Sequence, residues 1–498
     1  MTHNTLKPLM IVGTCSDAGK SVINAAFCRI FKQDGYTPAP FKAQNMSLNS
    51  YSTHEGGEMG RAQVVQAEAC GIQPHTEMNP VLLKPTNNKT SQVILNGKVV
   101  GNMSAQEYFG GQNNKDALFA EVASAFHRLA ERYNPIVLEG AGSISELNLR
   151  DKDIVNMRMA IEAKAATFLV ADIDRGGVFG SIYGTIELLT PEERAQIKGI
   201  IINKFRGDIS LFEEGRKMLE ELTKVPVLGV VPWFRDIKIE AEDSVSLEMK
   251  HNTHREGKLN VAIVLMRQMS NFTDFDVLEM DNRFNAYYTH TPKEVERADI
   301  ILLPGSKNTL SDLQFLKETG MATAIKTAYH AGKKVVGICG GYQMMGQRIE
   351  DPHGIEGPLK AVEGLGLLPQ YTVITPEKTT LQRTFRFLDG AERGCKGYEI
   401  HMGETHLMEG AEPHPLAFWE NDSEEGYLLN ERCWGTYLHG ILDNSEVLDF
   451  LESGLNENRA DKSHSFSYEM FKEEQYNKLA DLVREHIDMD KVYRILSE

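Results

Sequence analysis

The residues best suited to chemistry lie in a glycine-rich stretch around Cys339. Residues 333–338 are mostly apolar and β-branched at their centre, which predicts a buried strand. Gly340 and Gly341 end that run, and a helical pattern follows from Tyr342. Cys339 therefore occupies a tight strand-to-helix turn of the G-x-S-x-G type, with sulfur replacing the hydroxyl. The following N–H groups and the helix N-terminus favour a nucleophilic thiolate; a buried structural cysteine is the alternative.

A cysteine nucleophile needs a histidine that is adjacent in space rather than in sequence. His439 is the best candidate because it follows a predicted strand at residues 434–438. His401 and His406 are the alternatives to it. We therefore predict that Cys339 and His439 form a catalytic pair.

Acyl transfer to sulfur also needs N–H donors for the negatively charged intermediate. The N–H of Gly340 directly follows the cysteine, and the Gly305–Ser306 turn follows a predicted strand at residues 298–303. We predict an oxyanion hole from Gly305, Ser306 and Gly340.

A second candidate site lies near the N-terminus. A predicted strand at residues 8–12 is followed by GTCSDAGKS, residues 13–21, and then by a helical pattern to about residue 31. Such a loop holds phosphate on its N–H groups, with the lysine on the β/γ phosphates and the serine hydroxyl on Mg²⁺. The loop is one residue longer than G-x-x-x-x-G-K-[ST], and a plain glycine turn is the alternative. The predicted ATP-binding residues here are Gly13, Asp17, Gly19, Lys20 and Ser21.

Charged side chains follow several other predicted strands of this region. Lys42 follows the second strand and is expected to contact ATP or a substrate carboxylate; a surface lysine is the alternative. Glu139 ends the apolar strand PIVLE and is either a Mg²⁺ ligand with Ser21 or a capping residue; beside a phosphate loop we favour the metal. Basic loops after two further strands predict acceptor binding by Arg175, Lys204 and Arg206, with solvated loop charge as the alternative.

Composition limits the class of protein. The chain has 498 residues and a net charge of −17, which gives no electrostatic case for nucleic acid or an anionic membrane. No apolar run approaches the length of a membrane span, and the six cysteines form no C-x-x-C pair, which fits a reducing cytoplasm.

Alternating strand and helix patterns predict an α/β fold with a mainly parallel sheet in each of two domains. We place a phosphate-loop domain at residues 1–236 and a polar linker or weak edge hairpin at 237–258. A second α/β domain is predicted at residues 259–443, strand-rich from about residue 371, followed by a charged helical segment at 444–498. A helix is also expected at residues 58–70.

The cysteine region resembles the triad-type (class I) glutamine amidotransferase domain. The resemblance rests on GICGGYQ around Cys339, on His439-Gly440, and on the preceding Pro304-Gly305-Ser306. It implies attack of cysteine on the glutamine side-chain amide, release of ammonia, and a glutamyl thioester that water clears. Most members carry a glutamate two residues after the histidine, where this chain has Ile441.

The phosphate loop resembles that of the dethiobiotin synthetase group, and the combination of both domains resembles the cobyric acid synthase family. The matching stretches run from residue 13 to 440 and include FKAQNMSLNS, LEGAGS, DIDRGGVF, NKFRGD and GYEIHMG. The family implies glutamine- and ATP-dependent amidation of the b, d, e and g carboxylates of a corrinoid, adenosylcobyrinic a,c-diamide. Mg²⁺ is expected beside the phosphate loop. Ammonia must travel between the two sites without protonation in bulk water, so we also expect a passage between the domains. A cobyrinate a,c-diamide synthase and a non-catalytic P-loop ATPase are the alternatives, and the sequence predicts no oligomeric state.

Overall fold

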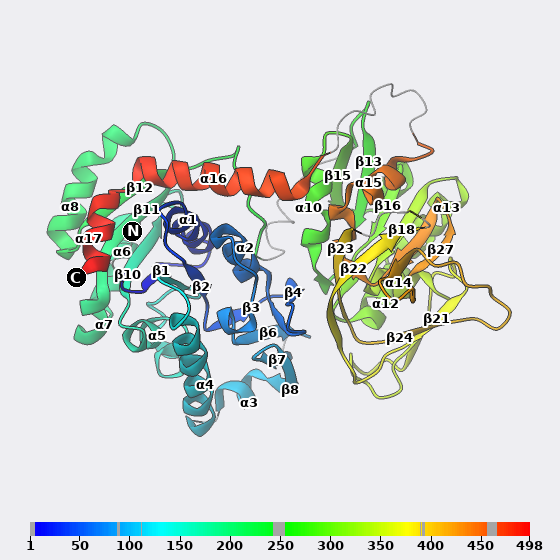
Figure 1. Ribbon diagram of the computed structural model, residues 1–498, viewed down its shortest axis with the longest axis horizontal. Coiled ribbons are helices and arrows are strands. Elements are labelled where there is room, and N and C mark those ends of the chain that lie inside the picture. Colours follow the sequence, from blue (N-terminus) through cyan, green and yellow to red (C-terminus); the bar gives the residue numbers. More distant parts are fainter. Residues whose placement is uncertain are drawn as a thin grey trace.

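The structure is a computed structural model that describes residues 5–86, 90–110, 112–242, 254–388, 390, 394–455 and 466–498. Two α/β domains lie side by side, and a long helix near the C-terminus runs along the first domain and reaches the second at one end (Figure 1). The predicted fold class is confirmed, because each domain is built on its own six-stranded sheet. No helix in the described part of the chain is long and apolar enough to cross a membrane.

The first domain is organised around a fully parallel sheet with strand order β12-β11-β10-β1-β9-β2. The strands are β1 (Leu9–Gly13), β2 (Ala39–Phe41), β9 (Ile136–Glu139), β10 (Ala166–Asp172), β11 (Ile197–Phe205) and β12 (Val227–Pro232). Both faces of the sheet are buried, which explains why the strands read as continuous apolar runs. Since parallel strands end at one edge, the residues following them converge there.

Helices cover both faces of this sheet. One face carries α1 (Lys20–Gln33), and the other carries α4 (Gln112–Ala130), α5 (Met157–Glu162), α6 (Val178–Glu187) and α8 (Glu213–Thr223). The short helices α3 (Ala105–Gly110) and α7 (Pro191–Gln196) belong to the same domain.

The helix predicted at residues 58–70 begins later than expected. It starts at Arg61 as α2 (Arg61–Cys70), because Gly60 is extended and residues Glu58–Gly60 form β5, which pairs with β4 (Ser50–Ser52). This β4–β5 hairpin lies beside a small sheet with order β3-β6-β7-β8. The strands of that sheet are β3 (Gln44–Met46), β6 (Val81–Pro85), β7 (Thr90–Leu95) and β8 (Lys98–Ser104).

The second domain has the sheet order β15-β13-β16-β18-β28-β27, parallel except for β27. These strands are β13 (Leu259–Val264), β15 (Phe284–Thr289), β16 (Ile300–Leu303), β18 (Lys334–Ile338), β27 (Tyr427–Asn430) and β28 (Cys433–Thr436). Its helices include α10 (Asp276–Met280), α11 (Pro292–Arg297), α12 (Thr309–Glu318), α13 (Met321–His330) and α14 (Gly340–Met345).

Two smaller sheets account for the strand-rich region expected after residue 371. One has the order β26-β25-β22-β23-β29 and the other β20-β19-β21-β24. The first contains β22 (Thr379–Phe387), β23 (Cys395–His401), β25 (Ala417–Trp419), β26 (Glu424–Glu425) and β29 (Leu438–His439). The second contains β19 (Arg348–Glu350), β20 (Ala361–Glu363), β21 (Gln370–Val373) and β24 (Glu404–Leu407).

The C-terminal residues 444–498 are divided between the domains rather than forming one unit. Helix α15 (Ser445–Glu452) packs into the core of the second domain. Helix α16 (Tyr468–His486) and α17 (Met489–Ser497) pack on the first domain, beside α1 (Figure 1). Ion pairs join α16 to α1 and to Asp34, the residue after it: Arg29 lies 2.6 Å from Glu473, and Arg484 lies 2.7 Å from Asp34. After completing the second domain, the chain therefore returns to the first domain and packs against it.

Candidate functional sites

Cys339 occupies a strained turn between β18 and α14. Its φ of 53° lies in the left-handed region, which is unfavourable for a residue with a side chain. The neighbouring glycines are required by close packing: a Cβ on Gly341 would lie 2.0 Å from the carbonyl oxygen of Leu303, and one on Gly337 would lie 2.6 Å from the sulfur of Met345. The predicted nucleophile turn is therefore built as a tight, crowded elbow that fixes the direction of the sulfur.

His439 is buried next to this cysteine. The predicted strand before it ends earlier, at Thr436, and His439 belongs to β29, which pairs with β23 in a different sheet. Its Nδ1 lies 2.7 Å from Oδ2 of Asp274, whose Oδ1 accepts a 2.9 Å hydrogen bond from the N–H of Gly440. Burial alone would lower the pKa of His439, but electrostatic attraction from Asp274 and from the neighbouring Cys339 raises it to about 10. The arrangement favours an imidazolium beside sulfur.

Asp274 was missed by the sequence reasoning, which left open what orients His439. It lies on a short 3₁₀ turn, Phe272–Phe275, between the two-residue strand β14 (Met269–Ser270) and α10. The two partners are 165 residues apart, and the position predicted for a glutamate is the buried, apolar Ile441. No local pattern around Asp274 pointed to this role.

The two alternative histidines have other partners. His401 stacks on Tyr437 with ring centroids 3.8 Å apart, and its Nε2 lies 3.4 Å from Oε1 of Glu399. His406 is about half exposed and faces Glu404. The sulfur of Cys339 does approach this region, lying 3.5 Å from the carbonyl oxygen of Ile400. The geometry therefore favours His439 as the partner of the cysteine.

The residues predicted for the oxyanion hole lie together around the elbow. Gly305–Ser306 is β17, which pairs with β14 and is therefore held as a strand rather than as a free turn. A Cβ on Gly340 would lie 2.8 Å from the nitrogen of Ser306, so the two backbones are in close approach. The hydroxyl of Ser306 donates a 2.6 Å hydrogen bond to Asp312. The main-chain N–H of Ser306 is therefore the group of this residue that fits the predicted oxyanion hole.

The phosphate loop has the expected strand–loop–helix context between β1 and α1. Gly19 has a φ of 95°, and a Cβ there would lie 2.1 Å from the side chain of Asn203. Lys20 is buried, and its Nζ donates to the carbonyl oxygens of Cys15 (3.1 Å) and Gly142 (2.9 Å). Burial lowers the pKa of Lys20 more than the surrounding carboxylates raise it. The lysine lies inside the loop region where a nucleotide phosphate would bind.

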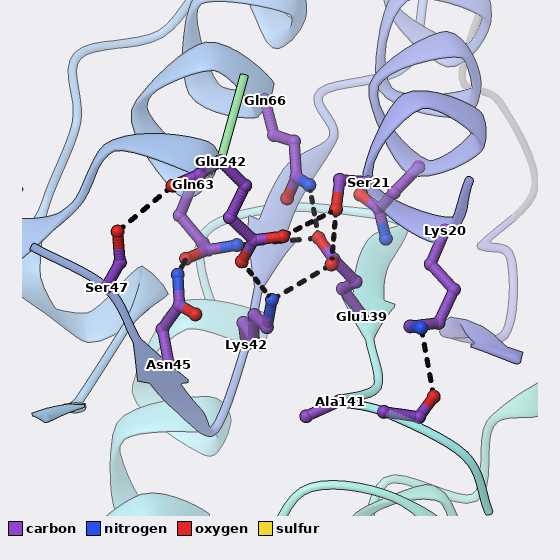
Figure 2. A network of polar contacts seen from close by, with 12 residues as sticks. Lys20, Ser21, Lys42, Asn45, Ser47, Gln63, Gln66, Glu139, Ala141 and Glu242 are labelled. Atoms are coloured by element: carbon purple, nitrogen blue, oxygen red, sulfur yellow. Dashed lines mark hydrogen bonds and ion pairs between the residues drawn. The ribbon is translucent and has the colours of Figure 1, made fainter. Parts of the chain in front are cut away.

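Carboxylates gather around Ser21 and Lys42 (Figure 2). The Oγ of Ser21 lies 2.7 Å from Oε1 of Glu139 and 3.0 Å from Oε2 of Glu242. The Nζ of Lys42 lies 3.0 Å and 2.5 Å from the same two carboxylates. Burial would lower the pKa of Lys42, but Glu139 and Glu242 raise it. A hydroxyl and a carboxylate are the oxygen donors that Mg²⁺ prefers, so Ser21 and Glu139 fit the predicted metal site.

Glu242 was also missed, because the sequence placed it in the linker predicted at residues 237–258. The described part of that linker, residues 237–242, lies against the first domain; residues 243–253 lie outside the described chain. Arg61 forms a 2.6 Å ion pair with Glu240, and Ser47 donates a 3.0 Å hydrogen bond to the carbonyl oxygen of Glu242. This part of the linker is therefore built into the nucleotide site.

The three basic residues predicted to bind the acceptor lie beside the phosphate loop, where aspartates compensate their charges. Arg175 lies 3.1 Å from Asp17, and Lys204 lies 2.9 Å from Asp172. Arg206 lies 2.6 Å from Asp174, and its guanidinium also stacks over Trp233. The predicted positive surface is thus largely neutralised by ion pairs, although Arg175 and Arg206 remain about half exposed.

The β4–β5 hairpin of the first domain reaches the histidine site of the second. The N–H of Ser50 donates a 3.0 Å hydrogen bond to Oδ1 of Asn271, which begins the turn that carries Asp274. The ring of Tyr51 lies 4.7 Å from that of Tyr398, whose other neighbour is the ring of His439 at 5.3 Å. The surroundings of His439 therefore include a residue of the other domain.

A buried ion cluster joins the domains at the same hairpin. Glu58 accepts from Lys84 at 2.7 Å and also pairs with Lys378 of the second domain. Two lysines on one carboxylate hold the pKa of Glu58 low despite its burial. Burial lowers the pKa of Lys378 to about 7. The first domain contributes Glu58 and Lys84 to this cluster, and the second domain contributes Lys378.

Comparison with known proteins finds a match for each of the two domains. Residues 9–247 match the family model described as the CobQ/CobB/MinD/ParA nucleotide binding domain, and residues 260–447 match the CobB/CobQ-like glutamine amidotransferase domain. A cobyric acid synthase of Parabacteroides distasonis is 70% identical over 98% of each chain. Those of Bacteroides fragilis and Phocaeicola vulgatus are 57% and 56% identical, over 100% and 99% of this chain and 99% of each relative.

Proposed function

Because this chain belongs to the cobyric acid synthase family, we propose that it amidates the b, d, e and g carboxylates of adenosylcobyrinic a,c-diamide, with glutamine as nitrogen donor and ATP as energy source. One observation carries the proposal: a buried Cys339–His439–Asp274 arrangement and a phosphate loop with Ser21 and Glu139 occur in one chain. The reaction belongs to cobalamin biosynthesis, and we place it in the cytoplasm.

The geometry of the second domain supports the glutaminase half of this proposal. The Cys339 sulfur attacks the side-chain amide carbon of glutamine, and N–H groups of Gly340 and the Gly305–Ser306 strand stabilise the oxyanion. The His439 imidazolium gives its proton to the departing nitrogen, which leaves as ammonia. The neutral imidazole then takes a proton from water as that water attacks the thioester. Glutamate leaves and the thiolate–imidazolium pair is restored.

The synthetase half activates the acceptor, because a carboxylate does not react directly with ammonia at neutral pH. The acceptor carboxylate attacks the γ-phosphorus of ATP, ADP leaves, and an acyl phosphate forms. Ammonia then attacks the acyl carbon and phosphate leaves, which gives the amide. Lys20 and Lys42 bring positive charge to the transferring phosphoryl group. Mg²⁺, when bound at Ser21 and Glu139, would neutralise phosphate charge.

Ammonia must pass from the second domain to the first without protonation in bulk water. The β4–β5 hairpin lies between the two centres: it contacts the surroundings of His439, and its preceding segment, through Ser47, contacts Glu242. We propose that ammonia crosses the interface near this hairpin. We further propose that the acceptor binds at the carboxyl edge of the first sheet. Arg175, Lys204 and Arg206 would contact its carboxylates there in place of their present aspartate partners, Asp17, Asp172 and Asp174.

The test is mass spectrometry of the corrinoid after incubation with the purified protein, ATP, Mg²⁺ and glutamine. We expect successive mass changes for up to four amidations, with partly amidated intermediates released because one ATP site must treat four carboxylates. Replacing glutamine by ammonium at high concentration should give the same products. An unchanged corrinoid under both conditions would refute the proposal. Amidation of unamidated cobyrinic acid at its a and c carboxylates alone would instead identify the a,c-diamide synthase activity.

A further inference from the structure

Glu242 reaches the nucleotide site from a segment between the two domains, which we call the interdomain strap and define as residues 240–242. The strap is fixed at several points. Arg61 contacts Glu240 through two hydrogen bonds of 2.6 and 2.9 Å, and Asn49 donates to the carbonyl oxygen of Ala241 at 3.4 Å. The carbonyl oxygen of Glu242 accepts from Ser47 at 3.0 Å. These contacts fix the backbone of the strap, and the backbone in turn determines where the side chain of Glu242 lies.

The strap places a second carboxylate, that of Glu242, beside Ser21 and Lys42. On α2, the side chains that face Glu139 are amides: Gln66 donates to its Oε2 at 2.5 Å, and Gln63 lies at 3.5 Å (Figure 2). The other oxygen, Oε1, is directed toward Ser21 and Lys42. Among the described residues with hydrogen bonds to Ser21, the acids are Glu139 and Glu242.

The position between these carboxylates already holds a positive charge. The ammonium of Lys42, which is buried, bridges Oε1 of Glu139 and Oε1 of Glu242. Two carboxylates and a hydroxyl also form a typical oxygen donor set for a hard divalent cation. A divalent cation held by these oxygens would replace Lys42 as their counter-charge and leave its ammonium for a phosphate or an acceptor carboxylate.

We propose that Glu242 is a ligand of the nucleotide-bound Mg²⁺ together with Ser21 and Glu139, so that the interdomain strap is part of the ATP site. The inference rests on the proposed ATP-dependent function. Its consequence is structural: the metal–nucleotide complex would fix the strap, and with it the segment of Ser47 and Asn49 that leads into the β4–β5 hairpin. Loading of the first site would therefore stabilise the contact between the domains.

The test measures metal binding rather than turnover. Mn²⁺ is titrated into the full-length protein with a non-hydrolysable ATP analogue, and free Mn²⁺ is followed by electron paramagnetic resonance. We expect Glu242→Gln, which removes the charge but keeps the size, to weaken Mn²⁺ binding at least about tenfold, as Glu139→Gln should. Glu68→Gln is the matched control, since Glu68 lies on α2 but pairs with Lys472 and Tyr476. It should bind Mn²⁺ as the unaltered protein does.

A second measurement separates direct ligation from loss of nearby charge. Broadening of the Mn²⁺ signal by ¹⁷O-labelled water counts metal-bound water, and Glu242→Ala should add one water molecule relative to the unaltered protein. Unchanged Mn²⁺ affinity in Glu242→Gln, or an unchanged water count in Glu242→Ala with intact thermal unfolding, would overturn the inference. Failure of the unaltered protein to bind the Mn²⁺–analogue complex would instead refute the proposed ATP dependence.

Discussion

Replacing Asp274 by asparagine tests the central feature of the glutaminase site. The substitution keeps the size of the side chain. It replaces one acceptor oxygen by an NH₂ donor and removes the negative charge 2.7 Å from Nδ1 of His439. Both side chains are almost completely buried, at 1% and 2% exposure, so solvent cannot replace the lost charge. We expect the pKa of His439 to fall from about 10 toward or below its ordinary 6.5. The histidine would then be largely neutral at pH 8.

The expected size of the effect follows from the burial of this pair. Removing one partner of a buried ion pair costs about 3–5 kcal/mol. If about 3–4 kcal/mol of that supports the imidazolium in the transition state, the glutaminase rate falls roughly 10²- to 10³-fold, at about 1.4 kcal/mol per factor of ten. Amidation with ammonium should change little, because it does not use the histidine.

The assay measures ammonia release from glutamine in parallel with ammonium-driven amidation of the corrinoid. Nuclear magnetic resonance of ¹⁵N-labelled histidine follows the protonation of His439. A raised pKa means that the pair stabilises the fold fully below about pH 6.5 and loses this contribution as pH rises through about 10. Asp274→Asn should therefore be less stable at neutral pH. A glutaminase rate within about fivefold of the unaltered protein, with an unshifted histidine titration, would refute the role of Asp274.

Three further substitutions test the two chemistries and their connection. Cys339→Ala should abolish glutamine-driven amidation and spare ammonium-driven amidation, measured by corrinoid mass; loss of both in a folded protein would mean that Cys339 is more than the glutaminase nucleophile. Lys20→Ala should abolish amidation with either nitrogen source, since carboxylate activation precedes both, and synthesis retained at saturating ATP would contradict the phosphate-loop assignment. Tyr51→Ala removes an aromatic contact worth about 0.5–1.5 kcal/mol, so glutaminase kcat should fall roughly two- to tenfold with the KM for ATP unchanged. An unchanged kcat would show that the hairpin does not support His439.

The sequence was sufficient wherever function depends on a contiguous stretch. The turn at Cys339 could be recognised because glycines on both sides of it are needed for close packing, and the structure shows that Gly337 and Gly341 have no room for a Cβ. The phosphate loop was recognisable for a similar reason, since a strand, a loop and a helix N-terminus adjacent in sequence create the cradle. The alternating apolar runs likewise predicted both α/β domains, because strands buried on both faces must be apolar throughout.

Only the tertiary structure decided which distant residues complete these centres. Asp274 orients His439 from 165 residues away, and Glu242 reaches Ser21 from 221 residues away. Neither acid lies in a distinctive local pattern. Ile441, at the position where most family members carry a glutamate, does not indicate which other residue orients His439. The return of α16 to the first domain was equally hidden, because its amphipathic pattern indicates a buried face without saying what covers it. A local pattern specifies backbone geometry, whereas the partner of a buried charge is set by how separate segments pack.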